Sequence, residues 1–224
     1  MRRVEKLFVV AFGISIGQIF GQTPLKLGAV PLVAEYEVIK RQRLADGNVL
    51  EKTEQGYYYR DSRGRTRVET GRFILLSDPE AGMHVVLDTE QKVARRIGRE
   101  GIHAMRDKVQ GVQIELNQFG GDQRPMTVRS LGMRVIEGLR CEGKELTTVI
   151  PPNSMLGNRH PVKIRVSMWV SSEVRLPILV LSDNPLSGRI VQRFKNIKRG
   201  DDPDPKLFQI PEGYKVVEIR PELQ

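Results

Sequence analysis

Residues 162–170 read Val-Lys-Ile-Arg-Val-Ser-Met-Trp-Val, and their side chains alternate strictly in character. A period of two is typical of a β-strand with one buried face, because successive side chains leave opposite sides of the pleat. One side carries the apolar set, namely Val162, Ile164, Val166, Met168 and Val170. The other side carries Lys163, Arg165, Ser167 and Trp169. The stretch therefore predicts a strand that presents an apolar face.

Two further strands are predicted directly after this one. A break that ends at Pro177 precedes a second apolar run, Ile178–Leu181. The sequence Asp-Asn-Pro-Leu-Ser-Gly at 183–188 then predicts a turn, and Arg189–Ile197 predicts a third strand. Three strands joined by short turns favour an antiparallel meander.

The same patterns recur through most of the chain. Asp46-Gly47 supplies the turn residues of a hairpin. Strands are predicted in the first hundred residues at Leu32–Arg43, Val49–Arg60, Arg65–Arg72, Ile74–Ser77, Met83–Asp88 and Val93–Ile97. Later strands are predicted at Leu131–Ile136, Leu139–Ile150 and Tyr214–Ile219.

One segment departs from the strand pattern. Apolar residues between 101 and 118 recur at intervals of three and four, which predicts a helix; they are Ile102, Met105, Val109, Val112 and Leu116. The predicted fold class is mainly β, α+β at most. It is a single curved antiparallel sheet, a half-barrel meander, with one or two helices.

The N-terminus has the features of a signal peptide. A basic start with Arg2, Arg3 and Lys6 precedes a mostly apolar run, Leu7–Phe20, which is short for a membrane-spanning helix of about 20 residues. We therefore predict a signal peptide over residues 1–22, a single β-rich domain over 23–224, and a periplasmic or secreted protein. A retained anchor and a buried helix are the alternatives, and no cysteine follows the apolar run for a lipid anchor.

Charge and cysteine content fit an exported protein. The net charge is +9, and removal of residues 1–22 takes away three basic residues and one acidic residue, which leaves +7. Such a protein could meet an anionic lipid or envelope polymer, although positive charge also serves solubility. Cys141 is the only cysteine, so no intramolecular disulfide can form, and its place in a predicted strand favours burial.

No motif in the sequence predicts catalysis, a cofactor or a metal. Gly13-Ile14-Ser15-Ile16-Gly17 matches a nucleophile elbow but lies in the predicted signal peptide. His84, His103 and His160 are isolated, and the acidic run at 201–204 lacks calcium-loop spacing. We expect no enzyme; an enzyme would require a cleft where acids or histidines converge.

A basic segment interleaves with aromatic residues between Tyr57 and Arg67. Its arginines, Arg60, Arg63, Arg65 and Arg67, predict a basic patch. In an exported protein such a patch favours an anionic lipid or glycan over nucleic acid. The alternative is an exposed hairpin whose charges prevent edge-to-edge pairing.

Several segments resemble a family of uncharacterised exported proteins found in acidobacteria. The similarity covers most of residues 55–217, and the family implies no established activity. The segments that carry it are 59–67 (Tyr-Arg-Asp-Ser-Arg-Gly-Arg-Thr-Arg), 78–82 (Asp-Pro-Glu-Ala-Gly), 137–138, 147–151, 157–161, 168–173, 196–197, 202–208 and 211–214.

The chain also resembles the periplasmic lipoprotein-carrier superfamily. The shared features are a signal peptide, a meander, a helical middle segment and a strand near Leu176-Pro177. The resemblance implies a half-barrel with helices on its concave side. Members of the superfamily include lipoprotein-sorting carriers and an envelope-stress regulator.

Two hypotheses for function follow. The first is an exported binding or carrier module for lipid or another apolar or amphiphilic ligand. Its candidate lining residues, which could instead be plain core, are Tyr36, Val38, Val85, Leu87, Val166, Met168 and Trp169. The second is an interaction or regulatory protein of the cell envelope that takes no small ligand and uses the basic patch. In both, membrane contact is expected only through the signal peptide before its cleavage.

Overall fold

The computed structural model describes residues 30–97, 126–154 and 157–219. The predicted signal peptide and the predicted helix at 101–118 lie outside these residues. The strands are β1 Leu32–Arg43, β2 Val49–Arg60, β3 Thr66–Thr70, β4 Phe73–Asp78, β5 Met83–Asp88, β6 Val93–Ile97, β7 Met126–Ile136, β8 Leu139–Ile150, β9 Val162–Ser171, β10 Leu176–Asn184, β11 Gly188–Arg199 and β12 Lys215–Ile219. A short 3₁₀ helix, η1, spans Pro205–Phe208.

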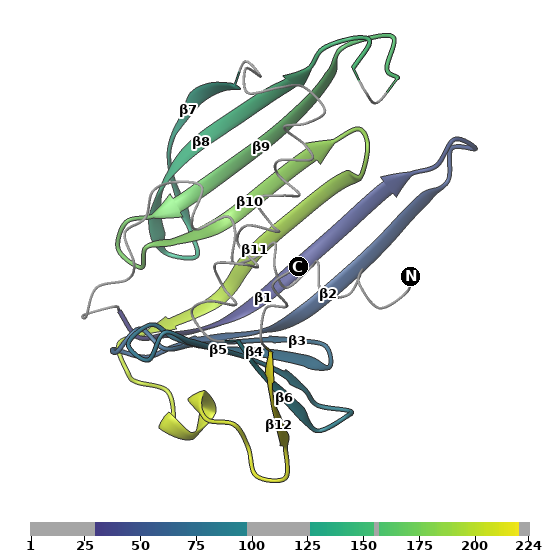
Figure 1. Ribbon diagram of the computed structural model, residues 1–224. Coiled ribbons are helices and arrows are strands. Elements are labelled where there is room, and N and C mark those ends of the chain that lie inside the picture. Colours follow the sequence, from purple (N-terminus) through teal and green to yellow (C-terminus); the bar gives the residue numbers. More distant parts are fainter. Residues whose placement is uncertain (1–29, 98–125, 155–156, 220–224) are drawn as a thin grey trace. The chain divides into compact units, whose positions relative to one another are not determined.

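The predicted mainly β fold class is confirmed. All twelve strands belong to one open sheet, in the order β12-β6-β5-β4-β3-β2-β1-β11-β10-β9-β8-β7 (Figure 1). Neighbours pair antiparallel along the described registers, with one exception, because β12 pairs parallel to β6. No helix within the described ranges is both long enough and apolar enough to cross a membrane.

The chain divides into two compact units. Of the described residues, the first comprises 30–36, 55–97 and 195–219, and the second comprises 37–54, 126–154 and 157–194. The boundary therefore passes through β1, β2 and β11. Each unit is described by itself below.

The first unit is a meander of short strands with a small core. Register partners such as Leu76 and Val85, or Ile74 and Leu87, place their side chains on the same side of neighbouring strands. The buried cluster consists of Ile74, Leu76, Val85, Leu87 and Ala94. Ile210 and Tyr214 pack against this cluster, so residues 200–214, which we call the strap, cover it.

The strap is fixed by local and long-range hydrogen bonds. The Asp204 side chain accepts a hydrogen bond from the Lys206 amide at the start of η1, and Pro205 pre-sets the backbone there. The Ser62 amide and hydroxyl donate to the two carboxylate oxygens of Asp202, at 2.6 and 2.8 Å. Ser62 belongs to the turn Asp61–Gly64, so this turn is tied directly to the strap.

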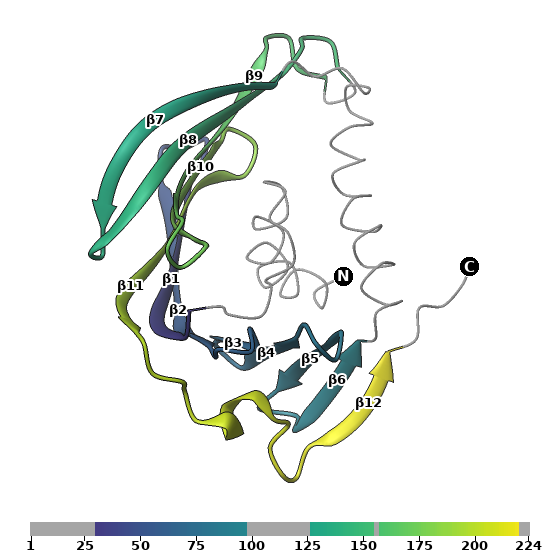
Figure 2. The ribbon, with the colours of Figure 1, turned by 90° about the vertical axis from the view of Figure 1, so that its left-hand side faces the viewer.

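The strap also explains the parallel strand. It carries the chain along the core to the far side of β6, where the Lys215 amide donates to the Lys92 carbonyl at 2.8 Å. The Lys92 ammonium lies 5.1 Å from the centre of the Tyr214 ring. Strand β12 then runs beside β6 in the same direction (Figure 2).

The second unit contains the predicted meander of β9, β10 and β11, which is confirmed by the antiparallel registers of these strands. The predicted hairpin at Glu137-Gly138 is confirmed as well, since β7 and β8 pair from Ile136 and Leu139 outward. Cys141 is fully buried beside its register partner Ser171, and burial raises the pKa of its thiol. The predicted burial of the lone cysteine is therefore confirmed.

Candidate functional site

Strands β7, β8 and β9 gather exposed and half-buried apolar side chains on one side. The registers align Val128 with Leu146 and Leu146 with Val166, so these three side chains share a side. The same side, which we call the apolar face, consists of Met126, Val128, Met133, Val135, Leu146, Ile164, Val166 and Met168. Met168 is buried, and Leu146, Ile164 and Val166 are half-buried.

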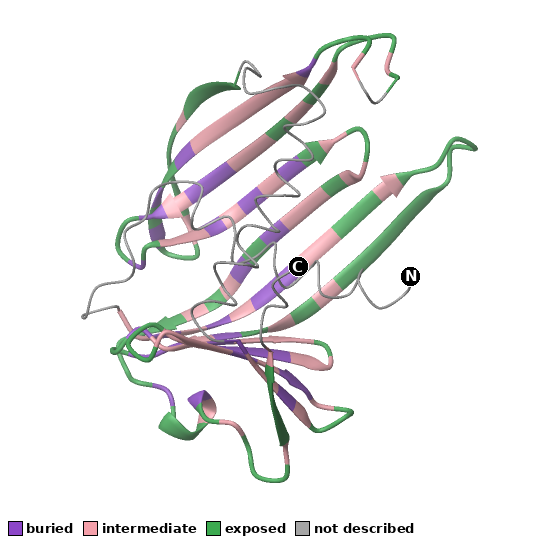
Figure 3. Cartoon of the chain, in the orientation of Figure 1, coloured by how far each residue is buried: buried purple, intermediate pink, exposed green. Residues whose placement is uncertain are grey.

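The apolar face is most open at β7, the edge strand of the sheet. Met126, Val128, Met133 and Val135 are 59%, 58%, 63% and 72% exposed. Figure 3 shows most of β7 in the colour of exposed residues. Four large apolar side chains, two before and two after the bulge, are exposed on one side of one strand, as is common at binding surfaces.

The reverse side of the same strands carries polar pairs beside the buried residues Leu139, Cys141 and Trp169. Arg129 and Glu145 are register partners and form an ion pair at 3.0 Å. The Ser167 hydroxyl donates to the other carboxylate oxygen of Glu145 at 3.3 Å. The contrast between the two sides shows that the exposed apolar residues are confined to one face.

A β-bulge keeps the two halves of β7 in phase. The register shifts between Ser130 and Gly132, so Leu131 is an extra residue relative to β8. Without it, strict alternation would turn Met133 and Val135 to the side opposite Val128. Gly132 has φ +76°, a conformation that favours glycine. The bulge therefore builds the apolar face.

The bulge is anchored on the polar side by the only tryptophan. A side chain at Gly143 would lie 2.5 Å from Trp169 Nε1 and 2.9 Å from Leu131 Cβ, so both residues pack over this glycine. The Arg134 guanidinium lies 5.0 Å from the centre of the Trp169 ring. This arrangement is a cation–π contact that covers the indole.

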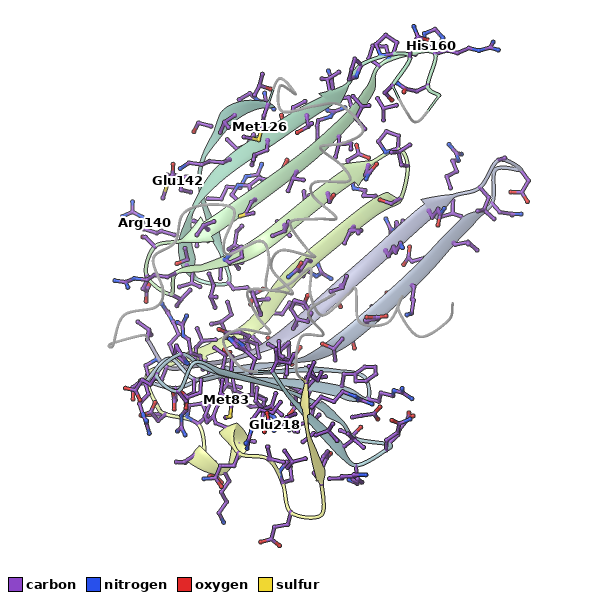
Figure 4. The ribbon with its side chains drawn as sticks, in the orientation of Figure 1. Met83, Met126, Arg140, Glu142, His160 and Glu218 are labelled. Carbon is purple, nitrogen blue, oxygen red and sulfur yellow. The ribbon has the colours of Figure 1, made fainter. Side chains whose placement is uncertain are left out.

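Charged side chains continue the apolar face toward the β7–β8 turn. Arg140, Glu142 and Lys144 alternate on β8 in line with Leu146. Lys144 and Glu142 form an ion pair at 3.3 Å, with both side chains about half exposed. Figure 4 shows Glu142 and Arg140 further along this edge than Met126. Glu142 and Arg140 are the register partners of Met133 and Val135, so apolar and charged side chains lie next to each other here and could contact both parts of an amphiphile.

The predicted lining residues lie in three places. Val166 and Met168 lie on the apolar face, and Trp169 lies on its reverse. Arg193 is the register partner of Leu179, which is the partner of Trp169, so these three side chains share the reverse side. Glu37 forms an ion pair with Arg193 and therefore lies on that side too. Its neighbour Val38 points the opposite way, to the side of Val166. Val38, Val166 and Met168 are thus brought to one side of the second unit.

The other predicted lining residues belong to the first unit. Val85 and Leu87 are fully buried in the core beneath the strap. Tyr36 is buried as well and belongs to the same unit. These positions fit the alternative of plain core.

The four exposed apolar residues of β7 were not among the lining residues predicted from the sequence. Their alternation changes phase at Leu131-Gly132, and a strict period of two therefore fails across the strand. The glycine after a leucine in an alternating run was the signal for a bulge.

The predicted basic patch is largely engaged within the first unit. Arg60 is buried and donates two hydrogen bonds to the Val30 carbonyl, at 3.0 and 2.7 Å. Arg65 pairs with buried Asp61 at 2.6 Å and lies 4.9 Å over the Phe208 ring. Their guanidinium groups therefore stabilise the fold of this unit.

The two remaining arginines of the patch also have carboxylate partners. Arg67 pairs with Glu69 at 2.6 Å and donates to the Leu207 carbonyl of the strap at 2.9 Å. Arg63 is exposed and pairs with Glu80 at 2.5 Å. Within the described ranges, no group of three His, Cys, Asp or Glu residues could hold a metal ion.

No family model and no curated protein matches the chain. Similar solved structures include an uncharacterised conserved protein from Thermus thermophilus, with 9% identity and a TM-score of 0.49, covering 92% of this chain and 99% of that one. MucB in the MucA/MucB complex of Pseudomonas aeruginosa has 10% identity and a TM-score of 0.39, covering 92% and 64%. LprF from Mycobacterium bovis has 12% identity and a TM-score of 0.30, covering 86% and 97%.

All three of these structures are less than 25% identical to the chain. At TM-scores below 0.5 they carry no argument about ligand or role. The resemblance to the acidobacterial family stays a prediction.

Proposed function

We propose that this chain is an exported binding module that carries a lipid or another amphiphile on the apolar face of β7–β9. The observation that carries the proposal is the set of four exposed apolar side chains of β7, held on one side by the bulge. A ligand that covered them would remove apolar surface from water at a gain of roughly 25 cal/mol per Å².

The charged side chains beside Met133 and Val135 favour an amphiphile over a purely apolar ligand. Arg140 and Lys144 are cationic and Glu142 is anionic, and all three continue the line of the apolar side chains. A polar headgroup can hydrogen-bond to these groups while its acyl chain covers the apolar side chains. Ligand sites commonly combine an apolar lining with a few polar groups of this kind.

Lipid extraction followed by mass spectrometry tests the proposal. Mature protein purified without detergent is expected to yield a co-purifying amphiphile. The double variant Val128→Glu/Val135→Glu should lose it about tenfold or more, because two carboxylates would be desolvated by the ligand. Thr127→Glu, on the polar side of the same strand, is the matched control and should keep the ligand.

Both sets of changes are at exposed positions, so stability should change by only about 0.5 kcal/mol. An empty wild-type protein, or equal loading of the double variant and the control, would contradict the proposal.

The alternative function, an envelope protein that binds a partner through the basic patch, rests on Arg63. It is the arginine of the patch whose side chain is most exposed, and Arg63→Glu would test it without breaking the contacts of the strap. A pull-down that loses a partner with this variant, from protein that carries no amphiphile, would favour the alternative.

A further inference from the structure

One end of the second unit gathers three connections between strands, and two of them carry exposed aliphatic side chains. The strand directions place the β1–β2 turn, the β8–β9 connection and the β10–β11 turn at this same end. The β1–β2 and β10–β11 turns are neighbours, because a side chain at Gly188 would lie 2.2 Å from the Arg41 carbonyl oxygen. We call this region, residues 41–51, 157–165 and 183–189, the turn end (Figure 1).

Large aliphatic side chains project from two of these turns. Leu44, Val49 and Leu50 flank the β1–β2 turn and are 36%, 57% and 56% exposed. Leu186 lies in the β10–β11 turn and is 51% exposed. The β1–β2 turn itself is well formed, with the Leu44 amide donating to the Asn48 carbonyl at 2.8 Å. The exposed side chains are therefore presented by an ordered hairpin.

The turn end is also basic. Its described residues include six cationic side chains, from Arg41, Arg43, Arg159, Lys163, Arg165 and Arg189, against three acidic ones, from Asp46, Glu51 and Asp183. Glu51 pairs with Arg41 at 2.5 Å, and the Asp46 carboxylate accepts hydrogen bonds from Asn48 within its own turn. Arg43, Arg159 and Lys163 are exposed at this same end of the unit.

Aliphatic tips surrounded by cations match one kind of surface. A lipid bilayer with anionic headgroups offers acyl chains for Leu50 and Leu186, and negative charge for the basic side chains around them. A protein partner with a purely apolar groove would gain nothing from the excess of positive charge.

We propose that the turn end docks the protein on an anionic membrane surface. This proposal replaces the expectation that the membrane is met only through the signal peptide. It uses residues other than those of the apolar face, so it stands or fails independently of the proposed function.

Flotation with lipid vesicles tests the proposal on the mature protein. The protein would be collected from the periplasm of an expressing bacterium, so that the predicted signal peptide is absent. Vesicles of 30% phosphatidylglycerol and 70% phosphatidylcholine should bind the protein, and pure phosphatidylcholine should bind it much less. Leu50→Ser/Leu186→Ser and Arg43→Gln/Lys163→Gln should each lower the partition coefficient about tenfold.

The control variants are Val216→Ser and Lys198→Gln, which are exposed positions of the first unit and should bind like wild type. Equal binding to both kinds of vesicle, absence of binding by wild type, or equal losses in controls and turn-end variants would overturn the proposal. Lipid extraction from the Leu50→Ser/Leu186→Ser variant separates the two ideas, since it should still carry its amphiphile.

Discussion

Gly143 leaves the space in which Trp169 and Leu131 pack against β8. Any side chain at this position would meet Trp169 Nε1 at 2.5 Å and Leu131 Cβ at 2.9 Å. We expect Gly143→Ala to destabilise the protein by about 1–3 kcal/mol, because the indole and the bulge must move apart. Urea unfolding followed by the fluorescence of the single tryptophan measures this directly.

The control for Gly143 is Thr127→Ala on the exposed start of β7, which should change the free energy of unfolding by less than about 0.5 kcal/mol. Equal free energies of unfolding for the two variants would show that Trp169 does not pack tightly on Gly143.

His84 gives a pH dependence at the residue scale. It is half-buried in β5, and burial lowers the pKa of its imidazole below the usual value of about 6.5. The unfolded chain therefore binds the proton first as pH falls. The stability due to neutral His84 is complete above about pH 6.5 and is lost at lower pH.

The free energy of unfolding should consequently rise between pH 5 and 7, with a slope from this residue of at most about 1.4 kcal/mol per pH unit. His84→Gln should flatten the slope, and His160→Gln in an exposed loop should leave it unchanged. A slope that survives His84→Gln in full would exclude His84 as its source.

The sequence predicted some residue environments and missed others. Burial of Cys141 followed from its place in a strand. The roles of Arg60, Arg65 and Arg67 did not follow, because their partners include Val30 and Leu207, which are far away in sequence. A segment of interleaved aromatic and cationic residues has the same sequence pattern whether the cations face solvent or pair with a buried carboxylate.

At the scale of elements, the strap is the clearest stabilising feature of the first unit. Phe208 is buried and lies under the Arg65 guanidinium, and Ile210 and Tyr214 cover the core. Phe208→Ala should lower the free energy of unfolding by about 3 kcal/mol, through lost ring burial and the cavity left behind. It should also speed tryptic cleavage at Lys206, because the strap would detach more often.

Chemical denaturation followed by circular dichroism, together with timed proteolysis, measures both effects. Gln209→Ala, at the exposed neighbouring position, is the control and should behave like wild type. Unchanged stability of Phe208→Ala would show that the strap is not needed for the core.

Most strands could be predicted from alternation and turn residues alone. The bounds of β1, β2, β5, β6 and β8 are those predicted. The parallel pairing of β12 was missed, because nothing in residues 215–219 specifies a partner strand. Only the strap, with its contacts to Ser62 and Arg67, places β12 beside β6.

The bulge in β7 shows why the candidate site was harder to predict than the fold. A single extra residue reverses every later side chain of a strand. Met133 and Val135 therefore join Met126 and Val128 on one side only in the folded sheet.

At the scale of the whole molecule, each of the two units has its own role. The first is closed by the strap over a small core, and the second keeps an apolar side partly open. An open apolar side is unfavourable in water unless something covers it. We predict that an amphiphile covers this side.

Methionine-methyl NMR tests this central claim most directly. The mature protein, labelled with ¹³C at its methionine methyl groups, would be titrated with lysophosphatidylcholine. We expect the signals of Met126 and Met133 to shift, because both lie on the apolar face, and the signal of Met83, packed on the core of the first unit, to stay unchanged. Unchanged signals from Met126 and Met133, or a shift confined to Met83, would contradict it.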